Sequence, residues 1–321
     1  MVEIDPKEAV AIRKQYNWGR QPFEGGVVAM DNKTVYLGPD TRGWPFSKFV
    51  ADEAGDFTSG KLYVYKHDLA EKWVEVDNTD PQKMLNFLDA AYEAGATMYD
   101  RIEWLAIDTT TGKVYWTETG TDNIGERAAW TDPLDQGAVH DPYHILKAQS
   151  MGLTGSDDPG YTNYYGAVWV YDPAVDSNYV VIEGGPFFEE SPSLADYPDK
   201  HLSNPDGLAV MYIDGQSVLV ICEDLNGRSN GRMPAGVSNS TCELWMLPIN
   251  KDAEYESYSV DDLIRITAVP QGAEVTGACP IPGGTLLVNS QHPNSDLPFP
   301  WNHSLTFAIN GFDNVTITDL D

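Results

Sequence analysis

The chain has 321 residues, of which 42% are hydrophobic, and its 28 glycines and 21 prolines can supply many turns. Its 20 Lys and Arg residues against 49 Asp and Glu residues give a net charge of −29, which disfavours binding to nucleic acid and to anionic membranes. Such acidity suits a cation binder or a protein in salty or extracellular water, although a solvated acidic surface explains it equally well.

The first predicted elements are two strands, over residues 1–5 and 9–16. They are followed by the first of four copies of a repeated pattern. Each copy has an acidic residue, a short apolar run with a small residue, a polar turn, and a second run rich in Val, Leu and Tyr. The copies begin at Glu24, Glu103, Asp206 and Glu274. Each predicts a β-hairpin, because two β-branched runs are joined by Asp-Asn, Thr-Gly, Asp-Gly or Gly-Gly.

Further strand-like runs follow each hairpin. They lie at 47–50, 61–66 and 73–76, at 166–171 and 179–182, at 242–247 and 263–266, and at 303–308 and 315–318. Two insertions interrupt them. Residues 80–96 predict a helix with Asp80 as N-cap, Pro81 in the first turn and Gly95 at its end. Residues 120–160 are polar and rich in Gly, Pro and Asp, which predicts a long loop with His140 and His144 on the surface.

Repeated hairpins with strands behind each one predict an all-β fold of the β-propeller kind, in which four-stranded blades surround a central channel. We therefore expect a single domain over residues 1–321 with about four blades and a partial one, incomplete at its N-terminus. The strands at 1–5 and 9–16 would be outer strands of the partial blade. More sequence or a second chain would be needed to close the ring.

The acidic residue that opens each copy would lie near the channel mouth, because the first strand of every blade lines the channel. Glu24, Glu103 and Asp206, together with Glu223 at the end of a following strand, are the candidate metal ligands. Carboxylate oxygens suit Ca²⁺ better than Zn²⁺. Arg101 and Glu103 share one face of a strand, so Glu103 could hold a metal beside an anion-binding Arg101, or the two could form an ordinary salt bridge.

Several classes of site and location find no support in the sequence. No run approaches the ~18 apolar residues of a membrane span, and the N-terminal residues lack the basic and apolar regions of a signal peptide. The three cysteines, Cys222, Cys242 and Cys279, form no CxxC pair, so a thiolate metal cluster is unsupported. Cys222 and Cys279 lie in apolar runs, which predicts buried neutral thiols, and one disulfide stays possible.

A series of short motifs runs through almost the whole chain. They are Val2-Glu-Ile-Asp-Pro6, Gly19-Arg20 with Glu24-Gly-Gly-Val-Val28, Lys48-Phe-Val-Ala-Asp52 with Gly60-Lys-Leu-Tyr63, Arg101-Ile-Glu103, Pro205-Asp206, Cys222-Glu-Asp224, and Gly277-Ala-Cys279 with Val288-Asn-Ser-Gln-His-Pro293. In content and order they resemble the C-terminal portion of the PhoX-type alkaline phosphatases.

That resemblance implies a six-bladed propeller whose channel mouth holds calcium ions and an oxo-bridged Fe³⁺ pair, and it implies phosphomonoester hydrolysis. By the same resemblance, Arg101 would contact the phosphate and Glu103 would be a calcium or iron ligand. Glu24 would be a metal-binding glutamate, and Asp206 and Glu223 would be calcium ligands. Metals would neutralise the phosphate oxygens while Arg101 stabilises charge on the transferred group.

The sequence departs from the family pattern at several points. Phe23 stands where the family has His before the first glutamate, and Gly207 stands where an Asn follows the Pro-Asp pair. The N-terminal portion of such phosphatases, with an iron-binding cysteine and an acidic cluster, has no counterpart here, so this chain alone is not expected to assemble the full iron site.

Three functions therefore stay open. The first is a calcium-dependent PhoX-like phosphatase that acts on a small-molecule phosphoester in an extracellular or periplasmic location. The second is a lactonase-type propeller hydrolase in which a divalent ion polarises a carbonyl. The third is a non-catalytic propeller that binds calcium or a partner.

Overall fold

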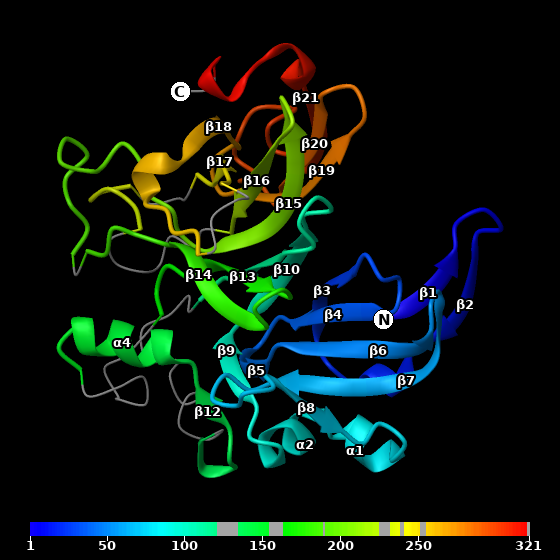
Figure 1. Ribbon diagram of the computed structural model, residues 1–321. Coiled ribbons are helices and arrows are strands. Elements are labelled where there is room, and N and C mark those ends of the chain that lie inside the picture. Colours follow the sequence, from blue (N-terminus) through cyan, green and yellow to red (C-terminus); the bar gives the residue numbers. More distant parts are fainter. Residues whose placement is uncertain are drawn as a thin grey trace. The chain divides into compact units, whose positions relative to one another are not determined.

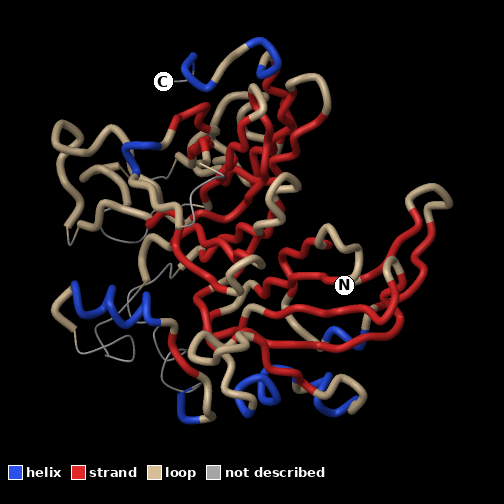
Figure 2. The backbone as a smooth tube through the Cα atoms, viewed as in Figure 1, coloured by secondary structure: helices blue, strands red, loops and turns tan. Residues whose placement is uncertain are grey.

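The computed structural model describes residues 1–120, 134–153, 163–188, 190–224, 232–237, 241–250 and 255–319. Strands and turns make up most of these residues, and the helices are short (Figure 2). The chain divides into two compact units, and the single domain over residues 1–321 stays a prediction. Unit 1 comprises Met1–Leu105, Gly125–Tyr161 and Pro173–Ser177, and unit 2 comprises Ala106–Ile124, Thr162–Asp172 and Asn178–Asp321.

The main sheet of unit 1 has five antiparallel strands in the order β3-β4-β6-β7-β8 (Figure 1). Their bounds are β3 (Phe23–Val28), β4 (Thr34–Pro39), β6 (Ser47–Glu53), β7 (Asp56–Tyr65) and β8 (Trp73–Val76). Alternate residues such as Leu37, Phe49 and Leu62 are fully buried in one core, as expected for strands with one inward face. These strands confirm the runs predicted around the first hairpin.

Two helices cover part of this core in place of the single helix predicted over 80–96. In α1 (Pro81–Leu85), Asp80 caps the helix by accepting a hydrogen bond from the Gln82 N–H at 2.8 Å, as predicted. Asn86 has non-helical backbone angles and separates α1 from α2 (Phe87–Glu93), which buries Phe87 in the core.

The first two predicted strands are present as β1 (Val2–Asp5) and β2 (Val10–Lys14), which form a two-stranded ribbon. Glu3 and Arg13 form an ion pair across it at 2.8 Å. Four apolar side chains of the ribbon are at least half exposed: Val2, Ile4, Val10 and Ile12.

A small sheet in unit 1 was not predicted. It has the order β12-β9-β5, with β5 (Arg42–Pro45), β9 (Thr97–Asp100) and β12 (Val139–His140). The described part of the expected 120–160 loop thus contains a strand, and it also contains the helix α4 (Pro142–Ser150), which Asp141 caps through the Tyr143 N–H. The expectation of surface histidines is wrong, because His140 is 7% exposed on β12 and His144 is 0% exposed on α4.

Unit 2 contains three further antiparallel sheets. Their orders are β10-β11-β13-β14, β15-β16-β17-β18 and β19-β20-β21, and the unit boundary falls within β10. The bounds are β10 (Ile102–Ile107), β11 (Val114–Glu118), β13 (Ala167–Asp172), β14 (Ser177–Glu183), β15 (Pro205–Ile213), β16 (Gln216–Glu223), β17 (Glu243–Pro248), β18 (Ile264–Ala268), β19 (Glu274–Ile281), β20 (Thr285–Gln291) and β21 (Leu305–Asn310). The hairpins predicted from the second, third and fourth copies are confirmed.

Two expectations for unit 2 are wrong. Residues 315–318 were expected to form a strand, but short 3-10 helices occupy Phe312–Asn314 and Ile317–Asp319. All three cysteines are free thiols, and Cys222 is buried as predicted, whereas Cys279 is exposed because it lies on an outward-facing position of β19. None of the helices in the described ranges has the length and apolar character needed to span a bilayer.

Candidate functional site

The candidate site of unit 1 is organised around Arg101, which lies between β9 and β10. Its Nη2 lies 2.6 Å from Oε1 of Glu103, and its Nε donates to Oδ1 of Asp40 at 2.9 Å. The side chains of Arg101 and Glu103 are only 13% and 4% exposed, so solvent screens these charge-assisted contacts weakly. The salt bridge that the Arg101–Glu103 spacing left open is therefore present.

The backbone at Arg101 is unusual, with φ of 65° in the left-handed region. A residue other than glycine in this region costs on the order of 1 kcal/mol or more, so such positions persist where surrounding contacts hold them. The two carboxylate contacts of the guanidinium are such contacts.

Glu24 on β3 reaches the same part of unit 1 because β3 and β10 approach each other closely. A Cβ atom at Gly25 would lie 2.2 Å from the carbonyl oxygen of Glu103 and 2.9 Å from Cδ1 of Leu105. Only a residue without a side chain fits there. The glycine after Glu24 therefore brings two predicted ligands, far apart in the sequence, to neighbouring backbone positions.

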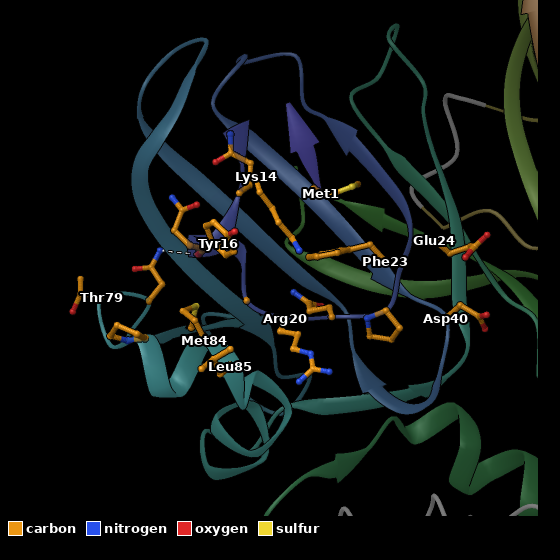
Figure 3. Close-up of a pocket in the computed structure, with 17 residues that line it drawn as sticks. Met1, Lys14, Tyr16, Arg20, Phe23, Glu24, Asp40, Thr79, Met84 and Leu85 are labelled. Carbon is orange, nitrogen blue, oxygen red and sulfur yellow. Dashed lines mark hydrogen bonds between the residues drawn. The ribbon is translucent and has the colours of Figure 1, made fainter. Parts of the chain in front are cut away.

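A cavity of about 1170 Å³ lies in unit 1, and Glu24 and Asp40 are both in its lining. Figure 3 shows these two carboxylates together at one end, with Tyr16 and Thr79 at the opposite end. Because Asp40 also binds Arg101, one carboxylate joins the cavity wall to the candidate phosphate-binding residue.

Asp40 was not predicted from the sequence, although the repeat offered a signal for it. It directly follows β4, the second strand of the first hairpin, just as Asp224 directly follows β16, the second strand of the third hairpin. The repeated pattern is defined by the acidic residue that opens each copy, whereas Asp40 lies after the second strand of its copy.

In unit 2, Asp206 and Glu223 lie on the paired strands β15 and β16, where Pro205 is opposite Glu223. The Glu223 carboxylate accepts hydrogen bonds from the backbone N–H groups of Ser203 at 3.0 Å and Glu243 at 2.9 Å. Burial raises the pKa of Glu223 to about 8, so its side chain is largely protonated at neutral pH.

Asp206 has different neighbours. Burial and, after it, the charges of Asp224 and Asp206 raise the pKa of Glu274 to about 8. The carboxyl group of Glu274 is therefore close enough to Asp224 and to Asp206 to be repelled by each of them. Successive strand residues point to opposite faces, which explains why Asp224 joins this group while the neighbouring Glu223 is held by Ser203 and Glu243.

The predicted ligands are thus divided, with Glu24 and Glu103 in unit 1 and Asp206 and Glu223 in unit 2. Their oxygen donors have the chemistry that Ca²⁺ prefers. Within the part of the chain that the structure describes, however, no three His, Cys, Asp or Glu side chains are grouped so as to hold a metal ion. The donors fit calcium in kind but do not form a preassembled site.

Comparison with known proteins gives one family and one strong structural likeness. Residues 1–294 match the family described as alkaline phosphatase PhoX. Among solved structures, the chain is similar to Pseudomonas fluorescens PhoX in complex with vanadate, a transition state analogue, with 22% identity and a TM-score of 0.65 over 98% of this chain. This chain spans 58% of the length of that protein. No curated protein matches the chain.

Two other solved structures are less similar. The PQQ-bound aldose sugar dehydrogenase from Streptomyces coelicolor has 12% identity and a TM-score of 0.30, covering 96% of this chain and 86% of its own. The GH43 endo-arabinanase from Bacillus licheniformis has 9% identity and a TM-score of 0.27, covering 91% and 93%. Neither likeness is strong enough to carry an argument about this chain.

Proposed function

Because the chain belongs to the PhoX alkaline phosphatase family, we propose that it forms the phosphate-binding part of a phosphomonoesterase, with Arg101 contacting the phosphate. The observation that carries the proposal is the Arg101 guanidinium held between Asp40 and Glu103 beside the cavity. A planar guanidinium matches the geometry of phosphate oxygens and stabilises charge that develops on them. The vanadate bound to the Pseudomonas fluorescens protein supports this assignment.

We also propose that the sheets are blades of a six-bladed propeller of which this chain supplies about four and a partial one. The sheets β3-β4-β6-β7-β8, β10-β11-β13-β14, β15-β16-β17-β18 and β19-β20-β21 support this proposal by their antiparallel order. The exposed apolar side chains of the β1–β2 ribbon support the proposal that further strands, from a second chain or another segment, complete the ring.

Calcium is the proposed metal, and the carboxylates proposed to hold it are Glu24, Glu103, Asp206 and Glu223. When bound, it would neutralise phosphate oxygens. Glu223 must release its proton before it can bind a cation, because its pKa is raised to about 8. Iron is proposed from the family alone. We also propose an extracellular or periplasmic location for the protein, and the net charge of −29 supports it.

The test is hydrolysis of p-nitrophenyl phosphate with Ca²⁺ and then with a chelator, with a lactone as the alternative substrate. Arg101→Ala should lower kcat/KM for the phosphoester by about 100-fold or more, the cost typical of losing a charged transition-state contact. Arg13→Ala, on the exposed ribbon, is the control. An unchanged rate in Arg101→Ala would remove this residue from the mechanism, and turnover of the lactone alone would favour the lactonase-type hydrolase.

A non-catalytic calcium-binding protein is the second candidate, favoured by the oxygen donors of the carboxylates named above, which suit Ca²⁺ in kind. Calorimetric binding of Ca²⁺ without turnover of either substrate would establish it in place of the phosphatase.

A further inference from the structure

The cavity of unit 1 is larger than phosphate binding requires. Its volume of about 1170 Å³ is close to that of pockets that enclose whole organic ligands, roughly 300–1,000 Å³. Arg101 does not line the cavity but donates to Asp40, which does, so a phosphate group at Arg101 would lie just beyond the end marked by Glu24 and Asp40. Most of the cavity would then face the rest of the substrate.

The surface that lines the cavity is mainly apolar, although polar side chains such as Gln15, Asn78 and Thr79 also contribute to it. Phe23 lies near the middle of the cavity, next to Glu24 on β3, and Tyr16, Met84 and Leu85 lie farther from the carboxylate end (Figure 3). A largely apolar wall with a few charged groups binds ligands that themselves have an apolar and a charged part.

Two cationic side chains, Lys14 and Arg20, also line the cavity. They set two positive charges against the carboxylates of Glu24 and Asp40, so a phosphate ester meets less repulsion in the cavity than it would beside the carboxylates alone. An aromatic group on that ligand could contact the Phe23 ring, since aromatic pairs gain energy beyond the area they bury.

Resting on the proposed function, we propose that this cavity is the subsite for the alcohol part of the substrate. It selects phosphomonoesters of ring-bearing alcohols over those of small alcohols, and Phe23 is the specificity-determining residue. Phe23 acts on the alcohol group, whereas Arg101 acts on the phosphate.

The test compares 2-phenylethyl phosphate with ethyl phosphate, two primary alkyl esters that differ chiefly in the ring. The wild-type chain should prefer the phenylethyl ester by about tenfold in kcat/KM, the size of effect that one apolar contact gives in a specificity pocket. Phe23→Ala should bring the ratio close to one. Phe57→Ala is the matched control, because Phe57 is also half-buried against the same core but does not line the cavity.

A second variant tests the subsite even if Phe23→Ala fails to fold. Leu85 is 54% exposed and lies in the cavity lining, so Leu85→Glu should fold normally while it places a charge in the subsite. Leu85→Glu should also lower the ratio of kcat/KM for 2-phenylethyl phosphate to kcat/KM for ethyl phosphate. A wild-type ratio near one, or a ratio that neither cavity variant changes, would overturn the subsite.

Calorimetry with 2-phenylethylphosphonate, which carries no ester bond to hydrolyse, separates this inference from the proposed function. Binding that weakens about tenfold in Phe23→Ala but not in Phe57→Ala supports the subsite even if no ester is hydrolysed. Hydrolysis of both esters with equal efficiency would support the phosphatase and overturn the subsite. Absence of phosphonate binding would also overturn it.

Discussion

Asp40 connects the cavity wall to Arg101 through a hydrogen bond of 2.9 Å to the guanidinium Nε. Because Glu103 holds Nη2 of the same group at 2.6 Å, the two carboxylates together fix the plane of the guanidinium. A planar, oriented guanidinium binds an anion with less loss of side-chain freedom than a mobile one. Asp40 is therefore expected to position Arg101 without touching the substrate.

Asp40→Asn keeps the size of the side chain and removes its charge, so Arg101 should lose one of its two ionic contacts. We expect kcat/KM for p-nitrophenyl phosphate to fall by about tenfold, with a smaller loss than in Arg101→Ala. Steady-state kinetics and inorganic phosphate inhibition measure the effect. Asp40→Glu should restore part of it, and the exposed Asp52→Asn should leave the rate unchanged; equal rates in Asp40→Asn and wild type would contradict the positioning role.

Gly25 gives a second prediction at the scale of single residues. A methyl group at this position would overlap the carbonyl oxygen of Glu103 at 2.2 Å, so Gly25→Ala should separate β3 from β10 and destabilise the chain by about 1–3 kcal/mol. Urea unfolding measures this cost. Gly26→Ala is the matched control on the same strand, because its new atom would mainly meet the flexible end of Met1; equal costs at the two glycines would show that the close approach is unimportant.

At the scale of elements, β12 and α4 bury two histidine rings whose centroids are 6.5 Å apart. Burial and, to a smaller extent, the charge of His144 together lower the pKa of His140 to about 3. The unfolded chain takes up a proton near the usual pKa of about 6.5, whereas folded His140 resists it. This residue therefore lowers stability as the pH falls from about 6.5 towards 3 and has no such effect above 6.5.

The difference in urea stability between wild type and His140→Phe should therefore change with pH. As the pH falls, the free energy of unfolding of His140→Phe should rise relative to that of wild type, by at most about 1.4 kcal/mol per pH unit for one proton. The exposed His303→Phe is the control. A His140→Phe profile parallel to that of wild type from pH 7 to pH 4 would contradict the effect.

The sequence predicts elements well where local chemistry determines them. Paired β-branched runs and their turns locate β3–β4 and β15–β16, and Asp80 and Pro81 locate the start of α1, because these signals lie within a few residues. The β12 strand has only two residues and depends on pairing with β9, so no local pattern marks it. For the same reason, the burial of His140 and His144 could not be predicted.

The candidate site was predictable only in part. The spacing of Arg101 and Glu103 raised the possibility of their ion pair, but the shared strand face that it predicted is wrong, because Arg101 lies outside β10 with a left-handed backbone. The contact of Arg101 with Asp40 joins residues 61 positions apart, and it depends on how β4 and β10 meet. The same holds for Glu223, whose neighbours Ser203 and Glu243 are each 20 positions away.

At the scale of the whole molecule, the excess of carboxylates predicts that divalent cations stabilise the folded chain. A ligand at 100 times its dissociation constant adds about 2.7 kcal/mol to the free energy of unfolding. Millimolar Ca²⁺ should therefore raise Tm, and a chelator should reverse the rise. Mg²⁺ at the same concentration should raise it less, because Mg²⁺ gives up its water ligands reluctantly.

Glu24→Gln should reduce the calcium-dependent rise in Tm, whereas the exposed Glu53→Gln should not. Differential scanning calorimetry with each variant measures this. An equal rise in both variants, or an equal rise with Mg²⁺, would assign the effect to general screening of the negative charge.

The β1–β2 ribbon has a practical consequence for anyone who purifies this protein. Aliphatic groups that face water on a narrow two-stranded hairpin adhere to other apolar surfaces and to one another, so concentrated samples should form aggregates through this hairpin. Threonine in place of Ile4 and Ile12 keeps a branched side chain that suits a strand and adds a hydroxyl group that water can solvate. Such a double variant should be the better starting point for crystal growth.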